Sequence, residues 1–274
     1  QSELFRLTFL TMVSSQASEK VFRNRASDGE AIDKRVQLNK RLQQHDFSRW
    51  ILELLRPVSG ERVLEIGCGR GTQTIPVANA VGPKGLVSFL DSSRESVDYT
   101  QSMIVGLTNA IPLTGEMDDI DELLADDTAR YDLTFSVYAL YYARDPIAVL
   151  QTMLNRLSPG GRLCVVGPDT PHGLVELARQ FHPIPAAVEE SLRFRSTTVE
   201  PFVKSNFDNA EIHILKNPQH FSDPDQLIEF YRQTTYFEPS AQAEIRNHIA
   251  ARMANGAEFV IDKFSYAVIA KKEI

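Results

Sequence analysis

The sequence predicts an α/β fold built on a doubly wound, seven-stranded and mostly parallel sheet, covered in part by a helical cap. Two observations carry this prediction. Short apolar runs alternate with helical patterns along residues 55–167, which is the order of repeated strand–helix units. The apolar run 63–66 also ends in alternating glycines, Gly67, Gly69 and Gly71, as expected where a buried strand turns into a helix over a ligand.

The composition limits the possible partners and compartments. A hydrophobic content of 43% allows a substantial core, and a net charge of −7 argues against a broad basic surface for nucleic acid. Residues 23–49 lean basic, but acids interleave with the cations as on a solvated helical face. No run is long and apolar enough to span a membrane, and residues 4–10 are too short and interrupted for a signal peptide. Cys68 and Cys164 lack metal-ligand spacing, so reduced thiols, no metal and a cytoplasmic location are expected.

The predicted elements of the first half follow in order. Residues 31–44 and 47–55 read as two helices, the second ending before Pro57. The strand that ends in glycines comes next, and residues 72–74 open a helix that stops at the turn 82–85. Further strands are predicted at 86–90, 109–114, 131–137 and, after the turn 158–161, at 162–167; helices are predicted at 92–104 and 146–156.

The strand–helix rhythm breaks after residue 167. Residues 168–206 contain five prolines among helical patches. A sixth strand is predicted at 210–215, helices at 223–237 and 241–254, and one long terminal strand at 259–270. We therefore expect residues 1–54 to form an N-terminal helical cap or lid. Residues 55–274 would form the sheet domain, with a cap insertion at about 168–208.

The glycine spacing indicates the type of ligand. The dinucleotide fingerprint is G-x-G-x-x-G, whereas residues 67–71 read G-x-G-x-G. Glu65 precedes the first glycine by two residues, where it would repel a pyrophosphate and suit a cationic centre such as a sulfonium or ammonium. Residues 65–71 resemble motif I of the class I methyltransferases that use S-adenosylmethionine (E/D-x-G-x-G-x-G). The alternative is a tight turn without a ligand.

This resemblance covers about residues 55–167 and, more loosely, the terminal strand. It implies the Rossmann-like methyltransferase fold, in which a seventh strand lies antiparallel beside the fifth, and S-adenosyl-L-methionine as cofactor. The cofactor-binding residues expected from the motif and the strand ends are Glu65, Gly67, Cys68, Gly69, Gly71, Thr72, Asp91, Ser92, Glu116, Met117 and Tyr138.

Acids that follow the second and third strands have specific expected roles. Asp91 would accept hydrogen bonds from ribose hydroxyls, or instead cap the helix that begins at 92–93. By the resemblance, Glu116 would bind the adenine amino group and Met117 would lie against the ring. Asp118 is the alternative acid, and a tract of solvated acids is the other interpretation.

The candidates for catalysis lie after the fourth and fifth strands. Residues 131–137 resemble motif IV of the same family, and Tyr138, Tyr141 and Tyr142 follow them, either lining a pocket or packing inside. Tyr141 stands where relatives often carry an active-site polar residue. His172 follows the fifth strand and could titrate near neutrality, the alternative being an exposed loop histidine.

Together these features predict an S-adenosylmethionine-dependent methyltransferase acting on a small organic molecule. The sequence leaves three kinds of acceptor atom as alternatives, namely oxygen, nitrogen and carbon. Natural-product biosynthesis is one type of pathway in which such an enzyme would act. The alternatives are an NAD(P)-dependent oxidoreductase, which the glycine spacing disfavours, and a non-methylating protein that binds S-adenosylmethionine. The expected partner is a small-molecule methyl acceptor, not nucleic acid or a membrane, and the chain would be a monomer or homodimer.

Overall fold

The computed structural model describes residues 29–104, 109–125, 129–254 and 256–273. Residues 1–28 of the expected N-terminal cap lie outside this description. No helix in the described part of the chain is long and apolar enough to cross a membrane.

The centre of the molecule is a seven-stranded sheet in the order β3-β2-β1-β4-β5-β9-β6. β1 through β5 pair in parallel, and β9 runs antiparallel between β5 and β6. The predicted fold class and the antiparallel strand beside the fifth are therefore confirmed. The strands are β1 Arg62–Ile66, β2 Leu86–Asp91, β3 Ala110–Thr114, β4 Tyr131–Val137, β5 Leu157–Asp169, β6 Ala210–Lys216 and β9 Phe264–Lys271.

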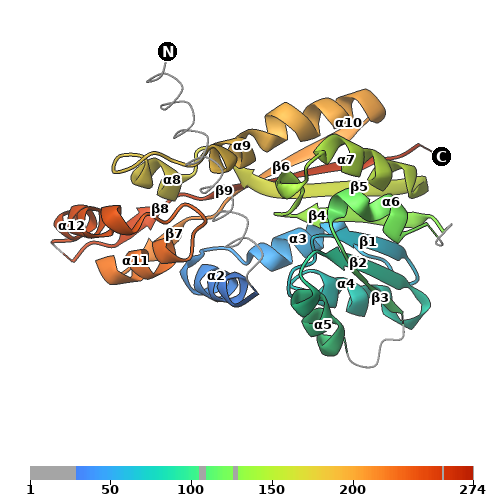
Figure 1. Cartoon of the computed structure of the whole chain (residues 1–274), viewed down its shortest axis with the longest axis horizontal. Coiled ribbons are helices and arrows are strands. Elements are labelled where there is room, and N and C mark those ends of the chain that lie inside the picture. Colours follow the sequence, from blue (N-terminus) through green and yellow to red (C-terminus); the bar gives the residue numbers. More distant parts are fainter. Residues whose placement is uncertain (1–28, 105–108, 126–128, 255, 274) are drawn as a thin grey trace, which may run out of the picture.

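Helices cover both faces of this sheet (Figure 1). On one face α3 (Phe47–Leu55), α4 (Thr74–Val81) and α5 (Arg94–Met103) bury Ile51, Val77 and Val97 against strand residues such as Val63 and Phe135. On the other face lie α6 (Ile120–Leu123), α7 (Pro146–Asn155), α9 (Ala186–Phe194) and α10 (Glu200–Asn206). Because successive strand residues point to opposite faces, β1 supplies Val63 to one core and Leu64 to the other.

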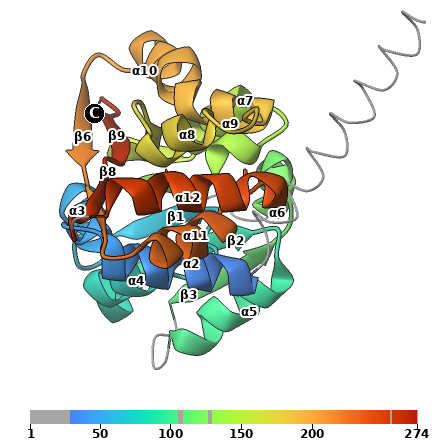
Figure 2. The same ribbon diagram turned by 90° about the vertical axis from the view of Figure 1, so that its left-hand side faces the viewer.

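A separate group of elements packs beyond the carboxyl ends of the parallel strands. α2 (Gly29–Leu42), α8 (Gly173–Ala178), α11 (Pro224–Arg232) and α12 (Gln242–Arg252) share a hydrophobic core with β7 (Gln219–Phe221) and β8 (Phe259–Ile261). We call these six elements the cap. In Figure 2, α2, α11 and α12 lie in front of the sheet. The division into residues 1–54 and 55–274 stays a prediction.

Two predicted strands differ from the structure. The single terminal strand at 259–270 is wrong, because Asp262 and Lys263 interrupt it and its halves, β8 and β9, belong to different sheets. β8 pairs instead with β7, which the sequence did not predict. The fifth strand begins at Leu157, so the expected turn 158–161 is part of β5, where Gly160 has φ 75° and the register with β4 shifts.

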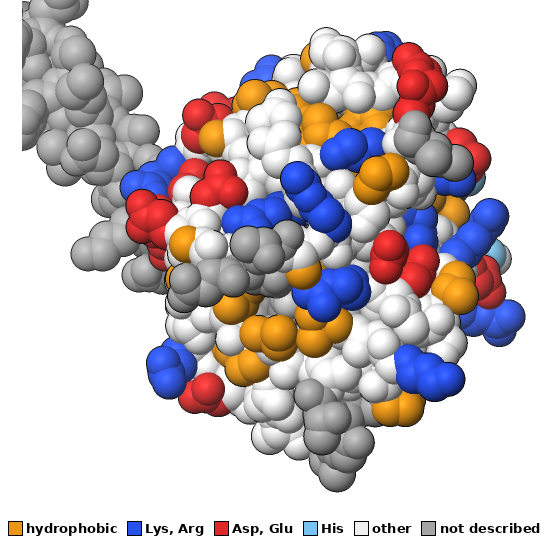
Figure 3. Space-filling view, turned by 90° about the vertical axis from the view of Figure 1, so that its right-hand side faces the viewer, with side chains coloured by type: hydrophobic (Ala, Val, Ile, Leu, Met, Phe, Trp, Pro, Cys, Tyr) orange, Lys and Arg blue, Asp and Glu red, His pale blue; other side chains and the backbone are white. Residues whose placement is uncertain are grey.

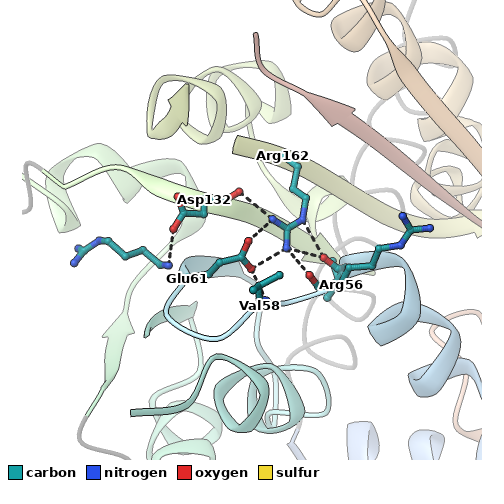
Figure 4. A network of polar contacts seen from close by, with 7 residues as sticks. Arg56, Val58, Glu61, Asp132 and Arg162 are labelled. Carbon is teal, nitrogen blue, oxygen red and sulfur yellow. Dashed lines mark hydrogen bonds and ion pairs between the residues drawn. The ribbon is translucent and has the colours of Figure 1, made fainter. Parts of the chain in front are cut away.

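The side chain of Arg162 joins the end of α3 to the amino-terminal edge of the sheet, the edge opposite the cap (Figure 4). We call its contacts with Glu61, Leu55 and Arg56 the Arg162 staple. Arg162 of β5 donates to both carboxylate oxygens of Glu61, at 2.6 and 2.9 Å. The same guanidinium donates to the carbonyl of Leu55 at 3.0 and 2.8 Å and to that of Arg56 at 2.9 Å. The carbonyls at the end of α3 thereby gain donors that the helix itself cannot supply.

On the face opposite the cap, basic side chains are interspersed with acidic and hydrophobic ones (Figure 3).

Candidate functional site

A cavity of about 540 Å³ lies between the carboxyl edge of the sheet and the cap. One part, the sheet half, is lined by Glu65 and by residues 67–70, 72–73, 90–92, 115–117 and 137–139. The other part, the cap half, is lined by α2, α8, α9, β7, the end of α11 with residues 234–236, and the link between β8 and β9. The sheet order reverses at β1 and β4, and ligands of open α/β sheets bind at this crevice.

Close packing explains two glycines of the loop after β1. A Cβ on Gly67, where φ is 77°, would lie 2.2 Å from the Cβ of Ala139. A Cβ on Gly71, where φ is 74°, would lie 2.7 Å from Thr100 Cγ2. The loop is held to β2 because Gly67 N and Cys68 N both donate to the Leu90 carbonyl, at 2.8 and 2.9 Å. The backbone can therefore pass close under a ligand.

Glu65 is a buried carboxyl group that borders this loop. Its side chain is 1% exposed, and Oε2 accepts a hydrogen bond of 2.6 Å from Thr74 Oγ1. Burial raises the pKa of Glu65 to about 8, against the lowering effect of the Thr74 hydrogen bond; the charge of Asp91 adds to the rise. No cation of the described chain pairs with Glu65. A cationic ligand group would supply the missing charge, so this position fits a sulfonium or ammonium.

Asp91 supports the loop from the end of β2. Oδ2 accepts from Gly69 N at 2.8 Å, and Oδ1 accepts from Ser93 N at 2.9 Å. Ser93 is the N-cap of α5 and accepts from Ser96 N at 3.3 Å. Ser93 rather than Asp91 is therefore the N-cap residue, while Asp91 accepts from the N–H of that residue and its carboxylate stays at the cavity wall.

The acids after β3 separate into two groups. Glu116 and Met117 line the cavity, as does Ser92 after β2. Asp118 turns away and accepts from the backbone N–H groups of Arg144 and Asp145, at 3.1 and 2.8 Å. Glu116 rather than Asp118 is thus placed to meet a ligand.

Three tyrosines after β4 line the middle of the cavity. Tyr138 has φ 56°, and its hydroxyl lies 2.7 Å from Ser265 Oγ. Tyr141 donates a hydrogen bond to Tyr142, and its ring meets Phe194 edge-on at 6.1 Å. Burial raises the pKa of Tyr138 and of Tyr141, so both phenols are neutral near pH 7.

His172 lines the cap half at the start of α8. Its Nδ1 is buried, and no described residue donates to it or accepts from it. Burial, with the nearby charge of Lys263, lowers the pKa of His172 to about 3. The expectation that this ring titrates near neutrality is wrong, because desolvation and a neighbouring cation both disfavour the imidazolium.

The structure adds a polar group that the sequence analysis missed. Asn39 Oδ1 accepts from Lys263 Nζ at 3.2 Å and from Gln219 Nε2 at 2.6 Å. Arg35 lies one helical turn before Asn39 and lines the same cavity. Burial and the charge of Arg35 lower the pKa of Lys263 to about 8. One feature of the sequence could have indicated this polar group: two charged residues, Asp262 and Lys263, interrupt the otherwise strand-like run 259–270.

Of the predicted site residues, all but Gly71 line the cavity. Gly71 is buried against Thr100 and Ile75, so it shapes the loop without forming a wall. In the described ranges, no group of three or more His, Cys, Asp or Glu is placed to hold a metal ion.

Comparison with known proteins identifies related chains. Residues 57–230 match the family described as a methyltransferase domain. The sequence is 30% identical over 150 residues to aklanonic acid methyltransferase DauC of Streptomyces sp. (strain C5), covering 53% of this chain and 66% of the relative. It is 24% identical over 255 residues to demethylmenaquinone methyltransferase of Lactococcus lactis, covering 91% and 93%. The matches to other curated relatives are shorter, spanning 33% of a transposon protein of Streptomyces fradiae and 42% of a ubiquinone biosynthesis O-methyltransferase of Xylella fastidiosa.

Solved structures share the fold. The plantazolicin methyltransferase BamL, in complex with a triazolic desmethylPZN analogue and SAH, superposes with a TM-score of 0.56 at 17% identity, covering 95% of this chain and 97% of that one. The YcgJ protein of Bacillus subtilis gives 0.54 at 16% identity, covering 83% and 98%.

Proposed function

The chain belongs to the methyltransferase domain family, and on that premise we propose that it transfers a methyl group from S-adenosylmethionine to a small organic acceptor. The observation that carries the proposal is the continuity of one cavity from the glycine loop and Glu65 to the cap half. Such a cavity can hold the cofactor and the acceptor side by side.

The residues of the sheet half fit the parts of this cofactor. Glu65 would face its cationic portion, since it is a buried carboxyl group without a cation of its own among the described residues. Asp91 would accept hydrogen bonds from the ribose hydroxyls, and Glu116 from the adenine amino group. Met117 would lie against the adenine ring. Gly67, Cys68, Gly69, Thr72, Ser92 and Tyr138 complete the proposed lining.

When bound, the cofactor supplies an activated methyl group on a sulfonium. The chain's own task is to hold the acceptor in line with that methyl group and to exclude water. Cap-half side chains such as Val175, Leu192 and Tyr236 provide an apolar wall for the acceptor. A base is needed only where the acceptor must lose a proton. We propose His172 and Tyr141 as catalytic candidates, because both line the cavity and His172 Nδ1 is buried without a partner in the described chain.

The names of the relatives guide the choice of acceptors for the test. The purified chain would be incubated with S-adenosylmethionine and aklanonic acid, demethylmenaquinone or a wider panel of phenols, amines and carboxylic acids. We expect the demethylated cofactor product and a methylated acceptor in equal amounts by mass spectrometry. The methylated atom would tell oxygen, nitrogen and carbon transfer apart.

Binding measurements separate the alternatives. Calorimetry should detect S-adenosylmethionine and S-adenosylhomocysteine but not NAD. Tight NAD binding without a response to the sulfonium would favour an oxidoreductase. Cofactor binding with no transfer to any acceptor would favour a non-methylating binding protein.

We propose a cytoplasmic location and a monomer or homodimer. Cys68 and Cys164 are buried free thiols, which fits a reducing compartment. Sedimentation at several protein concentrations would distinguish the two assembly states.

A further inference from the structure

The cap half of the cavity carries positive charge without a matching acid. Among the described lining residues, the acids are Glu65, Asp91 and Glu116, and all belong to the sheet half. The lining cations of the cap half are Arg35 and Lys40 of α2 and Lys263 of the β8–β9 link. Arg70 also lines the cavity, but it pairs with Asp33 at 2.9 Å and Glu95 at 3.0 Å.

Arg35 and Lys263 are the cations of interest. Neither forms an ion pair with a described residue, and Lys263 donates to the neutral Asn39 amide at 3.2 Å. Asn39 Nδ2 in turn donates to the Arg35 carbonyl at 2.8 Å, so one side chain connects the two positions. Their like charges repel, and the burial of Lys263 adds to the cost of its charge. An arrangement of this kind is stabilised when an anion binds between the two cations.

Lys263 is held in a defined position by its neighbours. Its carbonyl accepts from Asn217 N at 2.8 Å, and the Asp262 carbonyl accepts from Gly173 N at 2.9 Å. A Cβ on Gly173 would lie 2.7 Å from Ile261 Cγ2, so α8 packs directly on the link. The ammonium lies 5.5 Å from the centre of the Tyr138 ring, which places it near the boundary of the two halves.

An unpartnered acceptor beside these cations independently indicates a ligand. Gln219 is 1% exposed and lines the cavity, and its Nε2 is used by Asn39. Its Oε1 is buried and accepts no hydrogen bond from the described residues. An orphaned buried oxygen is costly unless a bound molecule donates to it.

We infer that the methyl acceptor is a small organic acid whose carboxylate binds between Arg35 and Lys263, with a hydroxyl or N–H group donating to Gln219 Oε1. This substrate class rests on the proposed function and narrows it. The apolar body of the acid would lie against Val188, Leu192 and Phe230. The guanidinium fork and the ammonium supply charge-assisted hydrogen bonds to the two carboxylate oxygens.

The test compares acids with their uncharged amides. Benzoate, 2-naphthoate and 2-anthracenecarboxylate would each be titrated against the matching carboxamide, with the protein saturated by S-adenosylhomocysteine. At least one acid should bind ten times more tightly than its amide. Arg35→Gln and Lys263→Met should each reduce that preference at least fivefold, and Lys263→Arg should restore part of it. Arg41→Gln, an exposed position of α2 outside the cavity lining, and Lys271→Met on β9 should leave the preference unchanged.

Several outcomes would overturn the inference. No preference for any acid, or a preference that both charge-removing variants retain, would exclude the pair as an acid site. A loss of S-adenosylhomocysteine affinity in these variants, without loss of acid preference, would assign the cations to the cofactor's own carboxylate. Methyl transfer to neutral acceptors at rates unaffected by either variant would leave the proposed function intact and reject the inference. Acid binding that depends on both cations, without any methyl transfer, would retain the anion site but reject both the proposed function and the acid's role as methyl acceptor.

Discussion

Glu65 connects cofactor binding to pH. Burial raises its pKa to about 8 in the unliganded protein, so the carboxyl group is mostly protonated at pH 7. A cation bound beside it favours the carboxylate, and binding should therefore release a proton. Affinity for S-adenosylmethionine should rise with pH, by at most about tenfold per unit below pH 8, and level off above it.

Calorimetry at pH 7 in two buffers with different ionisation enthalpies measures this proton release directly. Glu65→Gln should abolish it and weaken binding, since the amide cannot ionise. The same release in wild type and in Glu65→Gln would assign the proton to another group.

Asp91 is the second residue for which we predict an effect on cofactor binding. Its carboxylate holds Gly69 N at 2.8 Å and borders the cavity. Asp91→Ala should weaken cofactor binding by about 1–3 kcal/mol, because polar partners are left unsatisfied. Calorimetry with S-adenosylhomocysteine checks this, and Asp98→Asn on the exposed side of α5 is the matched control. Unchanged affinity in a correctly folded Asp91→Ala variant would reject the role.

At the scale of elements, the loop after β1 depends on its approach to the loop after β4. Gly67→Ala would place a Cβ 2.2 Å from Ala139 and strain a backbone with φ 77°. Gly60→Ala provides a control, because φ is 91° there but nothing lies within 4 Å. Gly67→Ala should destabilise the protein by about 1–3 kcal/mol more than Gly60→Ala, the usual cost of overpacking. Equal midpoints in urea unfolding would show that the loop relaxes without cost.

At the amino-terminal edge of the sheet, the Arg162 staple holds the end of α3 against β5 (Figure 4). Arg162→Met would leave the carbonyls at the end of α3 without this donor, and among the described residues Glu61 would keep only the N–H of Val58. We expect a loss of about 2–3 kcal/mol in unfolding free energy, the range for hydrogen bonds to charged groups. Arg94→Met removes an exposed pair with Asp98 on α5 and should change nothing measurable. Cofactor affinity should be retained in both variants, since neither side chain lines the cavity.

At the scale of the whole molecule, the cavity joins two separately packed groups of elements. Its walls come from the sheet and from the cap, whose core is a distinct cluster of buried residues. We predict that residues 29–50 and 168–206, which include α2 and α8 of the cap, act as a lid, so ligands that fill both halves should slow hydrogen exchange there more than in the sheet. Residues 20–28 belong to the same prediction, although they lie outside the described structure. Protection confined to the glycine loop and Asp91, with S-adenosylhomocysteine and an acceptor present, would place the acceptor elsewhere.

The sequence alone determined the parts of the protein that local patterns encode. The alternation of apolar runs and helical patterns predicted the fold, and the resemblance of residues 65–71 to motif I indicated the family and the cofactor loop. Glycines in this loop allow backbone angles that other residues avoid. Asp91, Glu116 and Met117 followed, since parallel strands bring their carboxyl ends to one edge.

Only the tertiary structure decided the composition of the cap half. Asn39 and Lys263 lie 224 positions apart in sequence, and Gln219 lies 180 positions from Asn39, yet they share hydrogen bonds. No spacing rule connects such residues, because their proximity results from how the cap packs on the sheet. The low pKa of His172 also depends on the tertiary structure. Burial and the charge of Lys263 lower this pKa to about 3, and the residues next to His172 in sequence indicate neither effect.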